Sequence, residues 1–319
     1  MKLLHQISTY LMFVLLIASI IAAGFIFKYN GQTSSTDKNW QAQLTQQNKD
    51  LEKVLIKQNQ NDALQKILSQ TPTGGVQIKD TIEKNIKMNN YRIESNLPPI
   101  EGRTLWGLVT QTTGLISLVS LLSIIISASI VAGEFTTGTI KLLLIRPLKR
   151  WKVLLSKYIT VLCFAFGGLI TLFMASFLMG GIFYSFSGTT QPYLDYIKGN
   201  VIEINMVGHI ATTYAYACVN LLMMVTFAFM ISTVFRNNSL AVGISLFLMF
   251  TGNALVGFLS KYSWVKYVLF ANTNLMVYTD GAPVVKGMTM TFSLLILAAY
   301  FIIFNVISWL VFNKRDVAA

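Results

Sequence analysis

The sequence has few charged residues. They occupy 12% of its 319 positions, whereas soluble domains carry about 25%. Two cysteines are present, Cys163 and Cys218, and both lie in apolar runs, so the sequence indicates neither a disulfide framework nor a cysteine metal site. These shortages exclude a disordered protein, a disulfide-rich secreted module and an ordinary soluble enzyme.

Catalytic signatures are also missing from the sequence. Its two histidines, His5 and His209, belong to no His-Glu-x-x-His motif, and no Gly-x-x-x-x-Gly-Lys-Ser/Thr phosphate loop occurs. His209 is better explained as a residue at the level of the lipid headgroups. We therefore expect a protein that is not an enzyme, with no catalytic residue, no metal site and no cofactor bound by the chain itself.

What the sequence does contain is apolar residues, at 54% of all positions, with a mean hydropathy of +0.57. A helix needs about 20 apolar residues to cross a membrane. Six stretches meet this condition, the first of them a retained helix or an equivalent uncleaved signal anchor. The third is too long for one straight span, which predicts a tilt, fraying at Gly180-Gly181 or an interfacial segment. The predicted spans are Ile7–Phe27, Leu105–Val131, Val153–Phe186, Gly208–Phe235, Leu240–Ser260 and Thr291–Phe312.

The basic residues of the short loops set the expected orientation. With six spans, they all fall on one side, and they predict that this side is the cytoplasm and that both termini lie there. The sequence thus predicts a multi-pass protein of the plasma membrane. We read the pI of about 9.6 as a response to lipid headgroups and expect no nucleic-acid partner. The residues concerned are Lys2, Lys141, Arg146, Lys149, Arg150, Lys152, Lys157, Arg236, Lys314 and Arg315.

The predicted organisation has three parts: a first helix at 1–27, an extracytoplasmic helical hairpin at 28–104, and a five-helix membrane region at 105–319. In the hairpin, apolar residues recur at helical spacing from Trp40 to Leu68 and again from Ile82 to Ile93, with a break at 71–75. The hairpin either recognises a substrate or is a solvated insertion. A further external loop, 261–290, is half apolar and predicts short interfacial or re-entrant helices. The fold class is all-α.

The link between the second and third spans, 132–150, predicts a short amphipathic helix at the membrane surface. Phe135 can enter the interface while Glu134 and the basic residues stay in water. A simpler alternative is a positively charged loop that only fixes topology. The order of residues from Gly133 to Lys152, Gly-Glu-Phe-x-x-Gly-Thr-Ile-Lys-x-Leu-Leu-x-Arg-Pro-x-x-Arg-Trp-Lys, resembles the corresponding segment of ABC-2 type transporter permeases of Gram-positive bacteria. The resemblance extends to the six-span plan, the apolar loop and the ending Phe312–Val317.

This resemblance implies that the link couples the spans to a separate ATP-binding subunit, which would bind the ATP and Mg. The coupling residues that it implies are Glu134, Phe135, Gly138, Thr139, Arg146 and Pro147. It also implies a homodimer, or a heterodimer with a related permease, that exports an amphipathic peptide, an antibiotic or another hydrophobic compound.

Polar and adaptable residues inside the spans suggest a substrate pathway. Amides there either bind substrate or join helices by hydrogen bonds, and methionines and aromatics either line a pathway or pack against lipid. The candidates are Asn220, Met223, Met224, Phe227 and Asn253. The alternative function is a membrane-anchored sensor or immunity protein whose external helical domain binds a ligand without transport.

Overall fold

The computed structural model describes residues 7–30, 39–60, 74–99, 104–139, 149–185, 192–197, 199–235, 237–280, 283, 285 and 287–314. Within these ranges, six helical segments are long and apolar enough to cross a membrane, so the expected all-α membrane class is confirmed. The six are α1 (Ile7–Asn30), the run of α5 (Leu105–Thr112), η2 (Thr113–Leu115) and α6 (Ile116–Thr136), α8 (Arg150–Tyr184), α9 (Met206–Val234), α10 (Asn238–Leu259) and α13 (Met290–Lys314).

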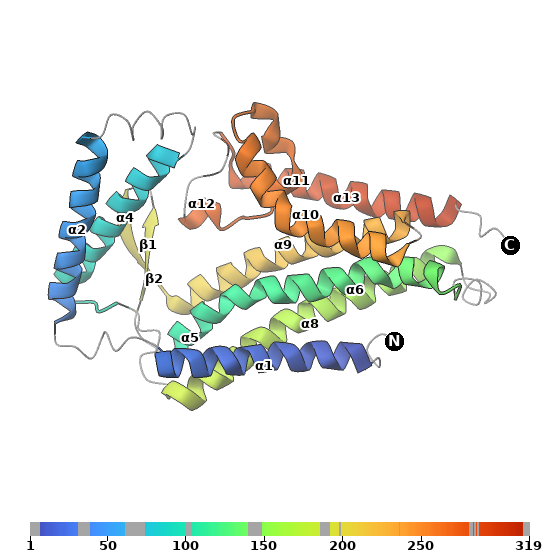
Figure 1. Cartoon of the computed structure of the whole chain (residues 1–319), viewed down its shortest axis with the longest axis horizontal. Coiled ribbons are helices and arrows are strands. Elements are labelled where there is room, and N and C mark those ends of the chain that lie inside the picture. The colour runs from blue at the N-terminus through green and yellow to red at the C-terminus, as the bar shows by residue number, and fades with distance from the viewer. Residues whose placement is uncertain are drawn as a thin grey trace.

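The bundle has two distinct ends (Figure 1). Helix α1 begins, and α13 finishes, at one end, which we call the terminal end. The helices α2 (Trp40–Gln60) and α4 (Gly74–Glu94) stand at the opposite end, which we call the hairpin end. An even number of spans requires this arrangement, because each span reverses the direction of the chain.

Helix α8 has 35 residues, about 52 Å at 1.5 Å per residue, so it exceeds a bilayer core of about 30 Å. The expected fraying at Gly180-Gly181 is wrong, because the helix continues unbroken to Tyr184. Gly180 instead permits close packing, since a Cβ there would lie 3.2 Å from the carbonyl oxygen of Leu105. Gly180 therefore marks a helix contact and not a helix end.

At the hairpin end, α2 and α4 pack along each other as expected, and an amide ladder joins them. The Nδ2 of Asn48 donates to the Oδ1 of Asn90 over 2.7 Å, and the Nδ2 of Asn89 donates to the Oδ1 of Asn48 over 2.8 Å. The expectation that 71–75 lies between the helices needs correction, because α4 already begins at Gly74. The predicted continuation of the first helix to Leu68 falls outside the described residues.

No local pattern in the sequence indicated the two-stranded antiparallel hairpin of β1 (Tyr193–Ile197) and β2 (Asn200–Ile204). It sits between α4 and the start of α9. The hydroxyl of Tyr91 donates to Glu203 over 3.1 Å, and the Nζ of Lys87 donates to the carbonyl oxygen of Gly199 over 3.2 Å. Through these contacts the helical hairpin rests on β1 and β2, and these strands lead into α9.

The half-apolar loop that follows α10 folds into the helical turns η3 (Ser263–Tyr267), α11 (Leu269–Asn272) and α12 (Val277–Asp280), in agreement with the short helices that were expected. The amide of Asn272 donates to the carbonyl oxygens of Lys266 and Val268 and accepts a hydrogen bond from Ser293 over 2.7 Å. This buried network fastens the loop to the first turn of α13.

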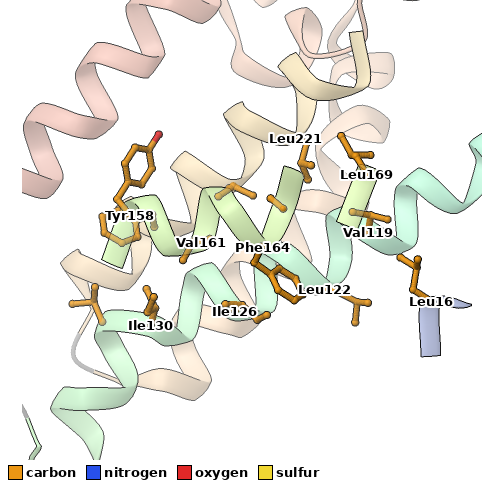
Figure 2. Close-up of a cluster of buried hydrophobic side chains, with 14 of the residues drawn as sticks. Leu16, Val119, Leu122, Ile126, Ile130, Tyr158, Val161, Phe164, Leu169 and Leu221 are labelled. Carbon is orange, nitrogen blue, oxygen red and sulfur yellow. The ribbon is translucent and has the colours of Figure 1, made fainter. Parts of the chain in front are cut away.

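The main core of the bundle lies where α6, α8 and α9 meet, and α1 covers it (Figure 2). The terminal half of this core is dense, with Val161 fully buried and the rings of Tyr158 and Phe229 5.1 Å apart. The hydroxyl groups of Tyr158 and Thr226 lie 2.8 Å apart and join α8 to α9. These contacts position the polar site at the terminal end.

Candidate functional site

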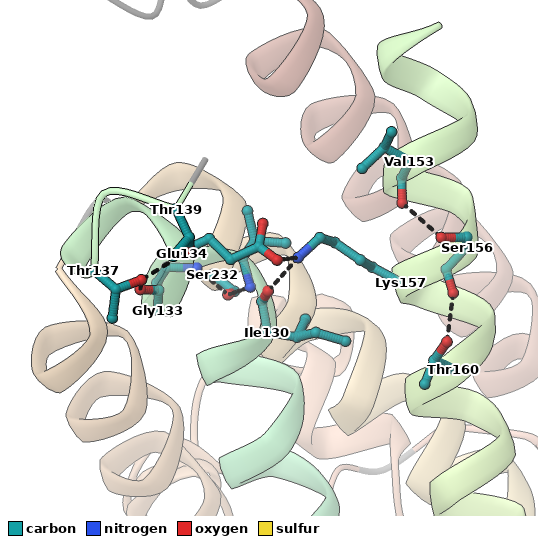
Figure 3. A network of polar contacts seen from close by, with 12 residues as sticks. Ile130, Gly133, Glu134, Thr137, Thr139, Val153, Ser156, Lys157, Thr160 and Ser232 are labelled. Carbon is teal, nitrogen blue, oxygen red and sulfur yellow. Dashed lines mark hydrogen bonds and ion pairs between the residues drawn. The ribbon is translucent and has the colours of Figure 1, made fainter. Parts of the chain in front are cut away.

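A buried ion pair joins α6 to α8 at the terminal end (Figure 3). The Nζ of Lys157 lies 2.5 Å from Oε1 of Glu134, and their side chains are 10% and 25% exposed. The same Nζ donates to the carbonyl oxygen of Ile130 over 2.7 Å. The other carboxylate oxygen of Glu134, Oε2, is buried and finds no hydrogen-bond partner among the described residues. Lys157 therefore compensates a carboxylate that would otherwise be isolated.

Helix α9 closes this site from a third side. The backbone N–H groups of Val131 and Ala132 both donate to the hydroxyl of Ser232, over 3.1 and 3.0 Å. The hydroxyl of Ser127 in turn donates to the carbonyl oxygen of Val225 over 2.7 Å. Small side chains at these positions allow the backbones of α6 and α9 to approach each other, as is common between helices in membranes.

Two further hydrogen bonds connect the site to the remaining helices at this end. The N–H of Asn238, at the start of α10, donates to the hydroxyl of Thr136 over 3.1 Å. A guanidinium nitrogen of Arg150 donates to the carbonyl oxygen of Asn313, near the end of α13, over 3.4 Å. We call the set Glu134, Lys157, Ser232, Thr136 and Arg150 the junction, because it ties α6, α8, α9, α10 and α13 together.

The expected coupling residues are only partly placed. Glu134 and Phe135 lie in the last turn of the spanning helix α6, so the predicted separate surface helix does not begin at Ala132. The reason is that no helix-breaking residue precedes Gly138, whose φ of +71° ends the helix in the conformation that glycine favours. Thr139 follows Gly138, and both are exposed. Arg146 and Pro147 lie outside the described residues.

The expected pathway residues have different surroundings in the described part of the chain. Met223 and Met224 are buried in two different apolar clusters, and Phe227 packs against both. Asn220 is half-buried on α9, and Asn253 is exposed on α10. Among the described residues, no group of three or more His, Cys, Asp or Glu side chains could hold a metal ion.

Sequence reasoning identified Glu134 but missed its partner. It expected Glu134 to stay in water, whereas the side chain of Glu134 is 25% exposed and pairs with Lys157 of the same chain. Ser232 was also missed. The available signal was weak: Lys157 lies one turn inside an apolar helix, where a lysine generally needs a nearby partner.

Comparison with known proteins identifies the family. The model of a family described as "Protein of unknown function (DUF2705)" matches residues 76–318. The chain belongs to the DUF2705 family. The expected membership of the ABC-2 type permease family is therefore wrong: it rested mainly on a link of about 20 residues, whereas the DUF2705 model covers most of the chain.

Two relatives come from Bacillus subtilis (strain 168). An "Uncharacterized protein YhcI" is 44% identical over 322 residues, which cover 100% of this chain and 97% of the relative. An "Uncharacterized membrane protein YdbK" is 35% identical over 214 residues, which cover 66% of this chain and 82% of the relative. No solved structure matches this DUF2705 protein.

Proposed function

We propose that this DUF2705 protein is the membrane-spanning subunit of an ATP-binding cassette transporter. In this proposal a separate ATPase subunit binds ATP and Mg and drives export of an amphipathic peptide, an antibiotic or another hydrophobic compound. The chain has no phosphate-loop motif of its own, so the energy has to come from a partner.

The observation that carries the proposal is the Glu134–Lys157 pair. A buried pair of charges costs desolvation energy and is not an economical way to stabilise a helix bundle. Ionisable residues inside membrane segments commonly mark functional elements. Here Glu134 lies just before the link 137–149 and Lys157 lies in the helix that follows it, so a force applied to the link reaches α6 and α8 together. Hydrogen bonds of the junction pass it on to α9, α10 and α13.

The orientation belongs to the same proposal. Lys149, Arg150, Lys152 and Lys314 all lie at the terminal end, and an excess of basic residues favours the cytoplasmic side. Both termini and the link would then face the cytoplasm, where an ATPase can reach them. The helical hairpin would face outward from the plasma membrane.

The pathway would form between two permease subunits, either two copies of this chain or this chain and a related one. Two arrangements support this part of the proposal. Met223 and Met224 are packed inside the chain, which leaves little room for a channel within one subunit. Asn253, by contrast, lies on the exposed face of α10, where it can meet a second subunit or a substrate.

A sensor or immunity protein is the second candidate, favoured by two hydrogen bonds. The bonds of Tyr91 to Glu203 and of Lys87 to Gly199 connect the external helices to β1 and β2, and thus to α9. A ligand bound at the hairpin could act on α9 by this route without any transport.

Co-purification separates the two functions. The chain is co-expressed with the phosphate-loop ATPase of a neighbouring gene, purified in detergent and assayed for a stable complex with ATPase activity. The transporter proposal expects such a complex, and it expects that Glu134→Ala or Glu134→Lys abolishes the stimulation of ATPase activity by the permease. Lys152→Ala, at an exposed position of α8, is the control. A chain that never co-purifies with an ATPase, or a Glu134 variant with unchanged stimulation, would contradict the proposal and favour the sensor.

A further inference from the structure

The turn η3 and the residue before it present aromatic side chains to the outside of the bundle. Tyr262, Trp264 and Tyr267 are 56%, 53% and 52% exposed. The turn is held in place from within, because Val265 is fully buried and packs in one apolar cluster with Val256 of α10. The rings of Tyr262 and Trp264 also stack, with 6.3 Å between their centroids. The three aromatics thus form an ordered outer surface, which we call the η3 surface.

Two lysines, Lys261 and Lys266, belong to the η3 surface. The Nζ of Lys266 lies 5.2 Å from the centre of the Tyr267 ring and 5.9 Å from that of the Phe292 ring, and such contacts hold a cation beside aromatic faces. Lys261 is exposed. Neither lysine forms an ion pair among the described residues, and the sequence has no acidic residue from 259 to 279. The η3 surface therefore carries positive charge that its own segment does not neutralise.

The length of α10 sets the depth of the η3 surface in a membrane. Helix α10 has 22 residues, about 33 Å at 1.5 Å per residue, which matches a bilayer core of about 30 Å. It ends at Leu259, two residues before Lys261, and α13 begins at the same end of the bundle (Figure 1). The hydroxyl of Tyr300 on α13 donates to the carbonyl oxygen of Tyr267 over 3.0 Å, so the turn stays beside the spans. The η3 surface thus lies at the boundary between the apolar layer and the headgroups.

Charge and surroundings decide which occupant fits this surface. Phe258, at the end of α10, is 82% exposed, and Leu295, in the second turn of α13, is 67% exposed, so the η3 surface continues into apolar helix faces. A symmetric contact with a second copy would place the same lysines against each other, and like charges across an interface repel. Aromatic rings and lysines side by side are instead typical of residues at the headgroup level of a bilayer.

We propose that the η3 surface binds anionic phospholipid headgroups of the leaflet at the hairpin end. The rings of Tyr262, Trp264 and Tyr267 lie among the headgroups and the upper acyl chains, and Lys261 and Lys266 pair with lipid phosphates. A zwitterionic headgroup carries its own cation beside the phosphate, so it competes poorly for the lysines. This inference depends neither on transport nor on which side of the membrane the hairpin end faces.

Fluorescence quenching by lipids that are brominated in their acyl chains tests the surface locally. The full chain with Cys163→Ser, Cys218→Ser and Ser263→Cys receives a bimane label at position 263, which is exposed. It is reconstituted into vesicles of phosphatidylcholine and phosphatidylglycerol in which one lipid or the other is brominated. We expect brominated phosphatidylglycerol to quench more strongly at equal mole fraction. The preference should be about fivefold or more, since each lysine near an anionic membrane surface contributes about that factor.

Substitutions of lysine separate the headgroup contact from general insertion into lipid. Lys261→Gln together with Lys266→Gln should make the two brominated lipids quench equally, while the aromatic side chains keep the label in contact with lipid. Lys49→Gln together with Lys53→Gln is the matched control, because it removes two charges from exposed positions of α2. The control should keep the preference of the wild-type lysines.

Four outcomes would overturn the inference. Equal quenching without any lysine substitution would show that the surface does not select headgroups, and a preference that survives Lys261→Gln with Lys266→Gln would place the selection elsewhere. Quenching by neither lipid would show that a second copy or another protein covers the surface. Loss of the preference on addition of soluble glycerol 3-phosphate would show that free phosphate esters, and not lipids, bind there.

Discussion

At the terminal end, α8 meets α6 and α9 through buried charges and hydrogen bonds, whereas at the hairpin end the same helix stands beside a groove of about 550 Å³. The difference follows from the side chains. Ser127 and Ser232 are small and allow close approach of α6 and α9. Phe166 and Phe173 are bulky and leave space between the backbones. One helix bundle thus carries a closed half and an open half.

Under the proposed function, the two halves would serve different purposes. The closed half holds Lys157 and Glu134 beside the link 137–149, which suits a part that receives and transmits force. The open half is apolar and adaptable, which suits a part that accepts ligands of variable shape. Variants in matched pairs can test whether this division is real.

The largest expected effect comes from removing the buried cation of the closed half. Lys157→Met leaves Glu134 buried without its counter-charge, a loss that typically costs about 3–5 kcal/mol. We expect a large drop in the thermal midpoint of the protein in detergent. This midpoint is measured by fluorescence-detected size-exclusion chromatography. Lys152→Met, one turn away and exposed, should change the midpoint little; equal drops for the two variants would refute a special role of Lys157.

A second pair compares packing in the two halves. Leu154→Ala removes a side chain that is 6% exposed in the core of the closed half, and should cost about 2 kcal/mol or more through the cavity it leaves. Met174→Ala removes a groove residue that is 55% exposed, and should cost less than about 1 kcal/mol. The same thermal assay applies. If Met174→Ala were the more damaging change, the groove would be a packed core and the comparison would fail.

A third pair refines the account of the hairpin end, where not every contact is loose. A Cβ at Gly252 of α10 would lie 2.5 Å from the ring of Phe270, so Gly252→Ala should destabilise the protein by about 1–3 kcal/mol. A Cβ at Gly243 of the same helix meets nothing within 4 Å, so Gly243→Ala should be neutral or stabilise by up to about 1 kcal/mol. If both variants raised the thermal midpoint equally, helix propensity and not the contact with Phe270 would decide the result, and the comparison would fail.

The smallest expected effect concerns the attachment of the helical hairpin. Tyr91→Phe removes an exposed hydrogen bond to Glu203, which is worth about 0.5–1.5 kcal/mol. Amides of α4 should exchange with deuterium faster, while those of α6 and α8 stay unchanged. Tyr29→Phe removes a hydroxyl from an exposed position of α1 and is the control. Exchange in α4 that matches the control would mean that this bond does not hold the hairpin in place.

The six apolar helical segments and the helices α2 and α4 could be predicted from the sequence, because apolar runs and helical spacing are local properties. The β1–β2 hairpin escaped notice although Tyr193–Ile197 and Asn200–Ile204 flank Gly199, which has a φ of +92°. Short strands next to long apolar helices give a weak signal. The pairing of Glu134 with Lys157 depends on how α6 and α8 are rotated against each other, which no local pattern specifies.

The family could not be predicted from the link alone. The motif from Gly133 to Lys152 combines a helix end at Gly138 with basic residues beside a membrane, and membrane proteins of more than one family need both features. The match of the DUF2705 model over residues 76–318 corrected that prediction.

The central claim is that the Glu134–Lys157 pair locks the closed half. A double-mutant cycle on the purified protein, with Glu134→Gln, Lys157→Met and both together, measures the pair most directly through thermal midpoints. We predict that the double variant is more stable than Lys157→Met alone, because it no longer buries an unpaired carboxylate. If the two substitutions add without any coupling, the side chains do not act as a pair, and the account of the junction is contradicted.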